Sequence, residues 1–310
     1  MNLRGLVLIA LCVSIGTRAH GGGFSKLPVS ARAVTLGGSL VSFSDDPNVL
    51  FYNPAGIAAL RSLSLSTSYT RLFPGITDDR LSYISGAAVA NLGFAGNLGV
   101  GVRSFSSNTW KENELVGSYA QQFFDFLSIG GSAKLLYWST PPPAGFLAVP
   151  EDGLSQATLS FDVGAQSTIR DIVPDNDIQF GIFFGDITRP SIARNGSGDG
   201  KLDLRMAVGA DYVSRVYDYI ITVHYTVAGD TRRIGIGGEF IALKTSLLDE
   251  PVELTLRAGG GGIQASGHQA DINGGLGLRV AGFWFDYAFA YQTQLLNIDG
   301  THHLTLRYSF

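Results

Sequence analysis

The chain has 310 residues, of which 45% are hydrophobic and only 15% are charged, with a formal net charge of −4. An ordinary soluble domain carries about 25% charged residues, yet the mean hydropathy of +0.18 is too low for a bundle of membrane helices. No stretch beyond the N-terminus reaches the roughly 18 consecutive apolar residues of a membrane-spanning helix. If the chain lies in a membrane, it therefore crosses as β-strands.

The N-terminus has the layout of an export signal. Arg4 precedes an apolar run over residues 6–15, and a small-residue site follows at residues 17–19. This pattern predicts a signal peptide over residues 1–19 that is cleaved after Ala19. The alternatives, a first strand or a membrane anchor, are disfavoured because the run is too short to span a bilayer. Cys12, the only cysteine, lies inside this segment, so the mature protein is expected to hold no disulfide and no cysteine-ligated metal.

Cleavage would also change the charge of the protein. Loss of Arg4 and Arg18 leaves 20 basic and 26 acidic residues, a formal charge of −6. An acidic balance disfavours nucleic acid as a partner, because binding to phosphates depends on clustered Lys and Arg.

Residues 20–60 follow no strand-like alternation. Gly37-Gly38 indicates a turn, and the pairs Asp46-Pro47 and Asn53-Pro54 each place a helix-capping side chain directly before a proline at the first helical position. We therefore predict two short helices, at 47–52 and 54–60. With the small residues Ala55 and Gly56, the segment can fold into a barrel lumen as a hatch or plug. The alternative is a cap on the periplasmic side.

From residue 61 onward the apolar residues recur at every second position, as in Phe285 and Tyr287 around Asp286. The predicted fold is all-β, a transmembrane antiparallel barrel of about 14 strands over residues 61–310 with a short N-terminal helical hatch. An even number of strands places both ends of the barrel in the periplasm, so the odd-numbered connections are extracellular. The two longest connections, 139–154 and 188–201, are both odd-numbered. The predicted strands are 61–72, 80–90, 95–105, 113–124, 126–138, 155–168, 177–187, 202–213, 216–227, 231–243, 251–262, 269–280, 282–292 and 301–310.

The two phases of these strands differ in chemistry. The apolar phase carries no charge, as expected for a lipid face, where one Lys or Arg at mid-bilayer costs about 2–4 kcal/mol. The other phase mixes glycine with scattered charges, whereas a soluble β-sandwich would fill it with Lys, Glu and Thr. We predict that the lumen is lined by the following charged residues: Lys134, Asp162, Asp203, Arg205, Asp211, Glu239, Arg257, Arg279, Asp286 and Arg307.

Three N-terminal runs, residues 31–38, 44–47 and 51–56, resemble the signature of the FadL-like outer-membrane superfamily, most of all its PorV/PorQ branch. The resemblance implies a 14-stranded barrel with an N-terminal hatch. Residues 304–310 also resemble the terminal strand by which barrels are recognised for outer-membrane assembly. The resemblance places the hatch motif at the following positions: Gly37, Gly38, Asp45, Asp46, Pro47, Asn53, Pro54, Ala55 and Gly56.

Other chemistry is disfavoured. The glycine run 259–262 lacks the following helix that a phosphate loop needs, and residues 195–200 lack the twelfth-position acid of a calcium loop, where Met206 stands. The histidines, His224, His268, His302 and His303, cannot be placed in register with a nucleophile. We therefore expect no catalytic residue, no metal and no cofactor.

The resemblance suggests a function. PorV and PorQ are accessory proteins of the type IX secretion system, so we expect an outer-membrane platform for secreted proteins or secretion components. The alternative is FadL-like transport of fatty acids or other hydrophobic small molecules, although the chain lacks the long extracellular insertions of true fatty-acid transporters. An outer-membrane hydrolase is a remote third possibility. Expected partners otherwise are outer-membrane lipid and the barrel assembly machinery.

Overall fold

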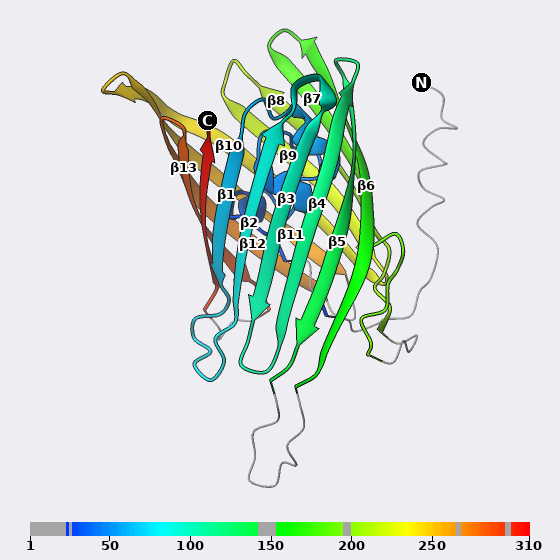
Figure 1. The fold of residues 1–310 in the computed structure, drawn as a ribbon. Helices are drawn as coiled ribbons and strands as arrows, with labels where there is room; N and C mark the ends of the chain where they lie inside the picture. Colours follow the sequence, from blue (N-terminus) through cyan, green and yellow to red (C-terminus); the bar gives the residue numbers. More distant parts are fainter. Residues whose placement is uncertain (1–22, 25–26, 142–152, 195–199, 265–267, 295–298) are drawn as a thin grey trace.

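In the computed structural model, fourteen antiparallel strands of the described residues close into one barrel (Figure 1). The structure describes residues 23–24, 27–141, 153–194, 200–264, 268–294 and 299–310. The predicted signal peptide, residues 1–19, lies outside these ranges. Within them, no helix is long and apolar enough to cross a membrane.

Each strand pairs with its neighbours in sequence, and the pairing of β1 with β14 closes the barrel. The prediction of a 14-stranded antiparallel barrel is confirmed, with most strand ends within three residues of those expected. The strands are β1 (Ser64–Arg71), β2 (Ser82–Asn91), β3 (Asn97–Ser106), β4 (Lys111–Phe123), β5 (Leu127–Ser139), β6 (Ser155–Val173), β7 (Asn176–Gly185), β8 (Arg205–Ser214), β9 (Tyr219–Ala228), β10 (Thr231–Leu247), β11 (Glu250–Gln264), β12 (His268–Val280), β13 (Phe283–Gln292) and β14 (Thr301–Ser309).

The alternation in sequence becomes an alternation of faces. On β6, Leu159 and Phe161 are 59% and 46% exposed on the outside, while Ser160 and Asp162 between them are 0% and 6% exposed on the inside. An apolar outer face on a closed barrel is the form in which strands cross an outer membrane, because no edge is left without hydrogen-bond partners. The chain is accordingly an outer-membrane barrel.

Two strands, β6 and β10, run more than three residues past their predicted ends, with β10 continuing to Leu247, and the later start of β8 changes the place of a predicted lumen residue. β6 continues to Val173, with an irregular register between Ile169 and Val173. β8 begins at Arg205, three residues after the predicted start. Leu202 therefore does not face lipid but is buried in the preceding connection, and Asp203 lies in that connection instead of on the barrel wall. The alternation at 202–204 continues that of β8, which is why the sequence pattern included these residues in the strand.

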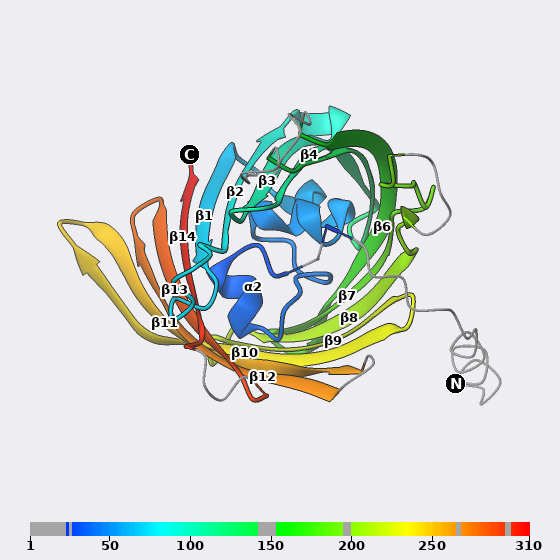
Figure 2. The ribbon, with the colours of Figure 1, turned by 90° about the horizontal axis from the view of Figure 1, so that it is seen from below.

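Residues 27–60 lie inside the barrel (Figure 2), where α2 (Ala31–Thr35) and two 3₁₀ helices, η1 (Pro47–Phe51) and η2 (Pro54–Ala59), pack against the wall. We call this part of the chain the inner segment. The two predicted short helices correspond to η1 and η2, which are 3₁₀ helices, and a third short 3₁₀ helix, η3 (Gly93–Ala95), lies between β2 and β3. The sequence analysis missed α2, whose five residues are too few to show a helical period.

Glycines on the wall allow the backbone of the inner segment to approach closely. A Cβ atom on Gly130 of β5 would lie 2.6 Å from the backbone nitrogen of Ala55, and one on Gly237 of β10 would lie 2.5 Å from the Cα of Leu36. Contacts this short are not tolerated, so any larger residue would displace the inner segment. The small residues of the inward phase are therefore the surface on which the inner segment packs.

Candidate functional site

A closed ring of alternating charges joins the inner segment to the wall. The guanidinium of Arg32 in α2 donates to both carboxylate oxygens of Glu239 in β10, at 2.9 and 3.0 Å. Arg257 in β11 contacts Glu239 at 2.5 Å and Asp286 at 2.7 Å. These contacts connect α2 to three strands through buried ion pairs.

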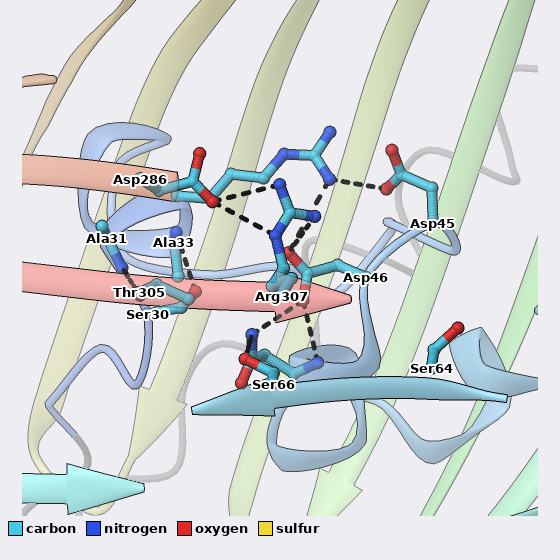
Figure 3. A network of polar contacts seen from close by, with 12 residues as sticks. Ser30, Ala31, Ala33, Asp45, Asp46, Ser64, Ser66, Asp286, Thr305 and Arg307 are labelled. Atoms are coloured by element: carbon cyan, nitrogen blue, oxygen red, sulfur yellow. Dashed lines mark hydrogen bonds and ion pairs between the residues drawn. The ribbon is translucent and has the colours of Figure 1, made fainter. Parts of the chain in front are cut away.

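The remaining members complete the ring (Figure 3). Asp286 in β13 accepts from Arg307 in β14 at 3.1 Å, and Arg307 lies 3.0 Å from Asp46 of the inner segment. Asp46 is in turn 3.8 Å from Arg32, while the more exposed Asp45 accepts from Arg32 at 2.8 Å. Three arginines and three acids thus alternate, so each buried charge has partners of opposite sign on both sides, which offsets the cost of burial.

Arg32 is the arginine that the inner segment contributes to the ring, and it is buried among carboxylates of the segment and the wall. Burial alone would lower the pKa of Arg32, but the carboxylates of Asp45, Glu239 and Asp46 outweigh burial and raise this pKa well above its usual value. The Arg32 guanidinium is therefore always charged. The charge balance of the ring then depends on its carboxylates staying ionised. The planar face of the guanidinium also lies 5.0 Å from the ring centroid of Phe43.

The hatch-motif residues hold the backbone of the inner segment. Asp46 caps η1 by accepting from the backbone of Asn48 at 2.9 Å, and Asn53 caps η2 by accepting from Ala55 at 3.1 Å, with Pro47 and Pro54 in the first turns. Asn53 also donates to the backbone oxygens of Val41 and of Ala165 on β6, at 2.7 and 3.1 Å. A single side chain thus fixes a helix start, a neighbouring turn and the wall.

The glycines of the motif serve tight backbone geometry. Gly37 and Gly38 have φ of +83° and +105°, a region that residues with a Cβ rarely adopt. The carbonyl oxygen of Gly37 accepts from Arg233 of β10. Gly56 packs so closely on Phe43 and Val49 that an added Cβ would lie 2.5 Å from the Phe43 carbonyl oxygen.

The other predicted lumen residues form separate contacts. Lys134 is 1% exposed and lies 2.7 Å from Asp162 and 2.6 Å from Asp186, a residue that the sequence analysis did not select. Asp211 accepts from Ser42 of the inner segment at 2.7 Å.

Three of the predicted residues lie apart from the inner segment's ring. Arg205 stacks on Phe183 with 4.7 Å between guanidinium carbon and ring centroid. Arg279 is paired at 3.4 Å with Glu253. Asp203 lies 3.7 Å from an exposed Arg189 in the connection before β8.

An apolar cavity of about 260 Å³ lies between the inner segment and strands β10–β14, at the end of the barrel that carries the longer connections. Its polar side chains include Arg233, Asp271, Asn273, Thr301 and His303. Its apolar lining is formed by Leu27, Pro28, Val34, Leu72, Phe73, Ile263, Ala270 and Ala290.

An aromatic cluster was missed by the sequence analysis. Phe24, 4% exposed, packs with Leu136, Trp138 and Ile192, and Trp110 stacks on Trp138 with centroids 4.6 Å apart. These residues come from the N-terminus, β5 and two connections, so no local pattern brings them together. The spacing of the tryptophans at the ends of adjacent strands was the available signal.

The histidines whose side chains the structure describes have separate surroundings. His303 points inward and shares a hydrogen bond of 2.8 Å with Thr70, while His302 on the opposite face contacts Tyr287. His224 is buried at 3% exposed, and His268 begins β12. Among the described residues, no group of three or more His, Cys, Asp or Glu side chains is arranged to hold a metal ion.

Comparison with known proteins finds neither a matching family model nor a matching curated protein. Solved structures do match. The toluene transporter TbuX of Ralstonia pickettii superposes with a TM-score of 0.64 at 13% identity, covering 92% of this chain and 99% of that one. A Pseudomonas aeruginosa FadL homologue gives 0.58 at 14%, covering 96% and 100%.

The Pseudomonas putida toluene transporter TodX gives 0.57 at 10%, covering 93% of this chain and 99% of that one. At such identities the likeness concerns the fold. It extends over 99–100% of each of the three neighbours, two of which are named as toluene transporters and one as a FadL homologue. The chain therefore has the fold of a FadL-type outer-membrane β-barrel.

Proposed function

We propose that the protein admits small hydrophobic molecules across the outer membrane. The observation that carries this proposal is the apolar cavity of about 260 Å³ between the inner segment and the wall. Pockets for small ligands are concave and mostly apolar with a few placed polar groups, which describes this cavity. The structural neighbours named as toluene transporters support the same class of cargo.

The filled lumen supports selectivity for such molecules. Leu36, Leu40, Leu50 and Ile57 of the inner segment are at most 1% exposed, and the ring of charges ties the segment to the wall. In the proposed mechanism, an apolar molecule leaves water for the cavity because burial of its surface is favourable, at about 25 cal/mol per Å². A polar solute gains no such free energy from the cavity.

A cavity-filling variant tests this function. Ala290 lines the cavity and faces inward, so Ala290→Phe should block it and reduce uptake of labelled toluene to the level of cells without the protein. The control is Ala133→Phe, which adds the same volume to the outward face of β5. Heat-modifiable migration on gels shows whether both variants fold. Unchanged uptake by a folded Ala290→Phe protein would refute the proposal.

The second candidate is a membrane platform for secreted proteins or components of a type IX secretion system. The observation that favours it is the N-terminal motif, which most resembles the PorV/PorQ branch. The same residues have packing roles, since Asn53 and Asp46 cap helices and Gly37 approaches the wall, so the motif does not separate the two functions. Export of secreted proteins by a deletion strain distinguishes them, because only the platform predicts a secretion defect.

A further inference from the structure

Two residues that line the cavity each have a buried polar atom without a hydrogen-bond partner among the described residues. The hydroxyl of Thr301 and the side-chain oxygen of Asn273 have no hydrogen-bond partner among the described residues, although the two side chains are only 1% and 3% exposed. Leaving such groups unpaired is costly, about 1–3 kcal/mol each. Both line the apolar cavity.

The two groups lie in one row across neighbouring strands. Asn273 of β12 is paired with Ala290 of β13, and Ala290 is paired with Thr301 of β14. Since strands are about 4.8 Å apart, the two polar residues flank Ala290 on either side. The small side chain of Ala290 leaves room between them.

The orientation of the Asn273 amide is fixed by its other contact. Its nitrogen donates to a carboxylate oxygen of Asp271 at 2.6 Å, and an amide oxygen in that place would be repelled by the carboxylate. The amide oxygen of Asn273 is therefore the unpaired atom, and it can only accept. The complementary ligand must bring a hydrogen-bond donor.

Arg233, the one arginine among the described residues that line the cavity, already has other partners. Arg233 contacts both carboxylate oxygens of Asp271, at 2.7 and 3.0 Å, and donates to the carbonyl oxygen of Gly37 at 2.9 and 3.2 Å. An anionic ligand would find a neutralised cation together with the acceptor oxygen of Asn273. The site thus disfavours a carboxylate head group.

We propose that this cavity binds a small neutral apolar molecule that bears one hydroxyl group, such as an alkylphenol. The hydroxyl lies over Ala290, donates to the Asn273 oxygen and accepts from the Thr301 hydroxyl. A dry cavity of about 150 Å³ accommodates benzene, so a cavity of about 260 Å³ has room for one ring with a short alkyl chain. This inference rests on the proposed function and narrows its cargo.

Equilibrium dialysis of the purified barrel in detergent tests the inference with three matched probes: 4-propylphenol, 4-propyltoluene and 4-propylbenzoate. Partition into protein-free micelles is measured and subtracted. We expect the phenol to bind about tenfold more tightly than the toluene, which is the effect of one net hydrogen bond to a buried group. The benzoate should bind more weakly than both.

Isosteric variants locate the effect. Thr301→Val removes the hydroxyl without changing the shape of the side chain and should abolish most of the preference for the phenol while leaving 4-propyltoluene binding unchanged. Asn273→Leu should act in the same direction. The control is Thr255→Val, a buried inward position on β11 outside the cavity.

The outcomes separate the inference from the proposed function. Equal binding of the phenol and the toluene, both lost in Ala290→Phe, would overturn the hydroxyl preference and leave hydrophobic transport standing. Tightest binding of the benzoate would overturn the neutral ligand. Binding of none of the three probes by the folded barrel would overturn both proposals.

Discussion

A ring of buried, alternating charges joins the inner segment to the barrel wall. Its four wall residues, Glu239, Arg257, Asp286 and Arg307, contact one another or the inner segment, and the period of two in the sequence predicted that all four face inward. Their partner Arg32 stands 207 positions before Glu239. Pairing over such distances is set by barrel closure and cannot be inferred from local spacing.

Removal of one ring member should loosen the inner segment. Arg32→Met leaves Glu239 and Asp46 without a cation on one side, and breaking a buried pair in this way costs about 3–5 kcal/mol. Hydrogen exchange of residues 30–60 should therefore increase while the strands stay protected. Asp45→Asn is the control, since Asp45 is 60% exposed and such a contact contributes at most about 1 kcal/mol. Equal exchange in both variants would show that the ring does not hold the segment.

At the scale of elements, strands were easier to predict than the inner segment. Fourteen strands of about ten residues repeat the same apolar alternation, so errors at single positions do not alter the result. The short helices of the inner segment have few residues and no period, and the sequence revealed η1 and η2 only through their caps, Asp46 and Asn53. α2 is capped by Ser30, which stands in a run without a following proline and gave no such signal.

Two adjacent glycines of β10 test how the inner segment packs on the wall. Gly237→Ala would place a Cβ 2.5 Å from the Leu36 Cα, whereas Gly238→Ala faces outward, with its nearest atom 3.6 Å away. We expect Gly237→Ala to destabilise the packing by about 1–3 kcal/mol and Gly238→Ala to be neutral. Hydrogen exchange of the inner segment, recorded at increasing temperature, measures the effect of each substitution. The reverse order would place residues 31–38 elsewhere than against β10.

At the scale of the whole molecule, the outer face and the filled interior define the protein. The outward residues form an apolar surface, and the inward ones bind the inner segment through glycines, ion pairs and caps. The class of fold could be predicted from sequence because it depends on the repeated pattern. The cavity could not be, because residues 27–38 and strands β10–β14 form it together.

A charge placed on the outward face of the barrel should destabilise the protein in a membrane. Val208 on β8 is 46% exposed on the outside, and Val208→Arg would place a charge in lipid at a cost of about 2–4 kcal/mol near mid-bilayer. Urea unfolding in vesicles should reveal the loss. Arg205→Leu on the inward face should be tolerated, because the Arg205 Nε has no hydrogen-bond partner among the described residues. Greater damage from Arg205→Leu would reverse the assignment of the faces.

We propose that the barrel passes hydrophobic molecules and excludes polar ones. The most direct measurement compares, in vesicles with and without the protein, the entry of labelled toluene and the swelling caused by a small sugar such as arabinose. We expect faster toluene entry and no protein-dependent swelling, because the inner segment lies in the lumen. Swelling by the sugar at a porin-like rate, without faster toluene entry, would contradict the proposal.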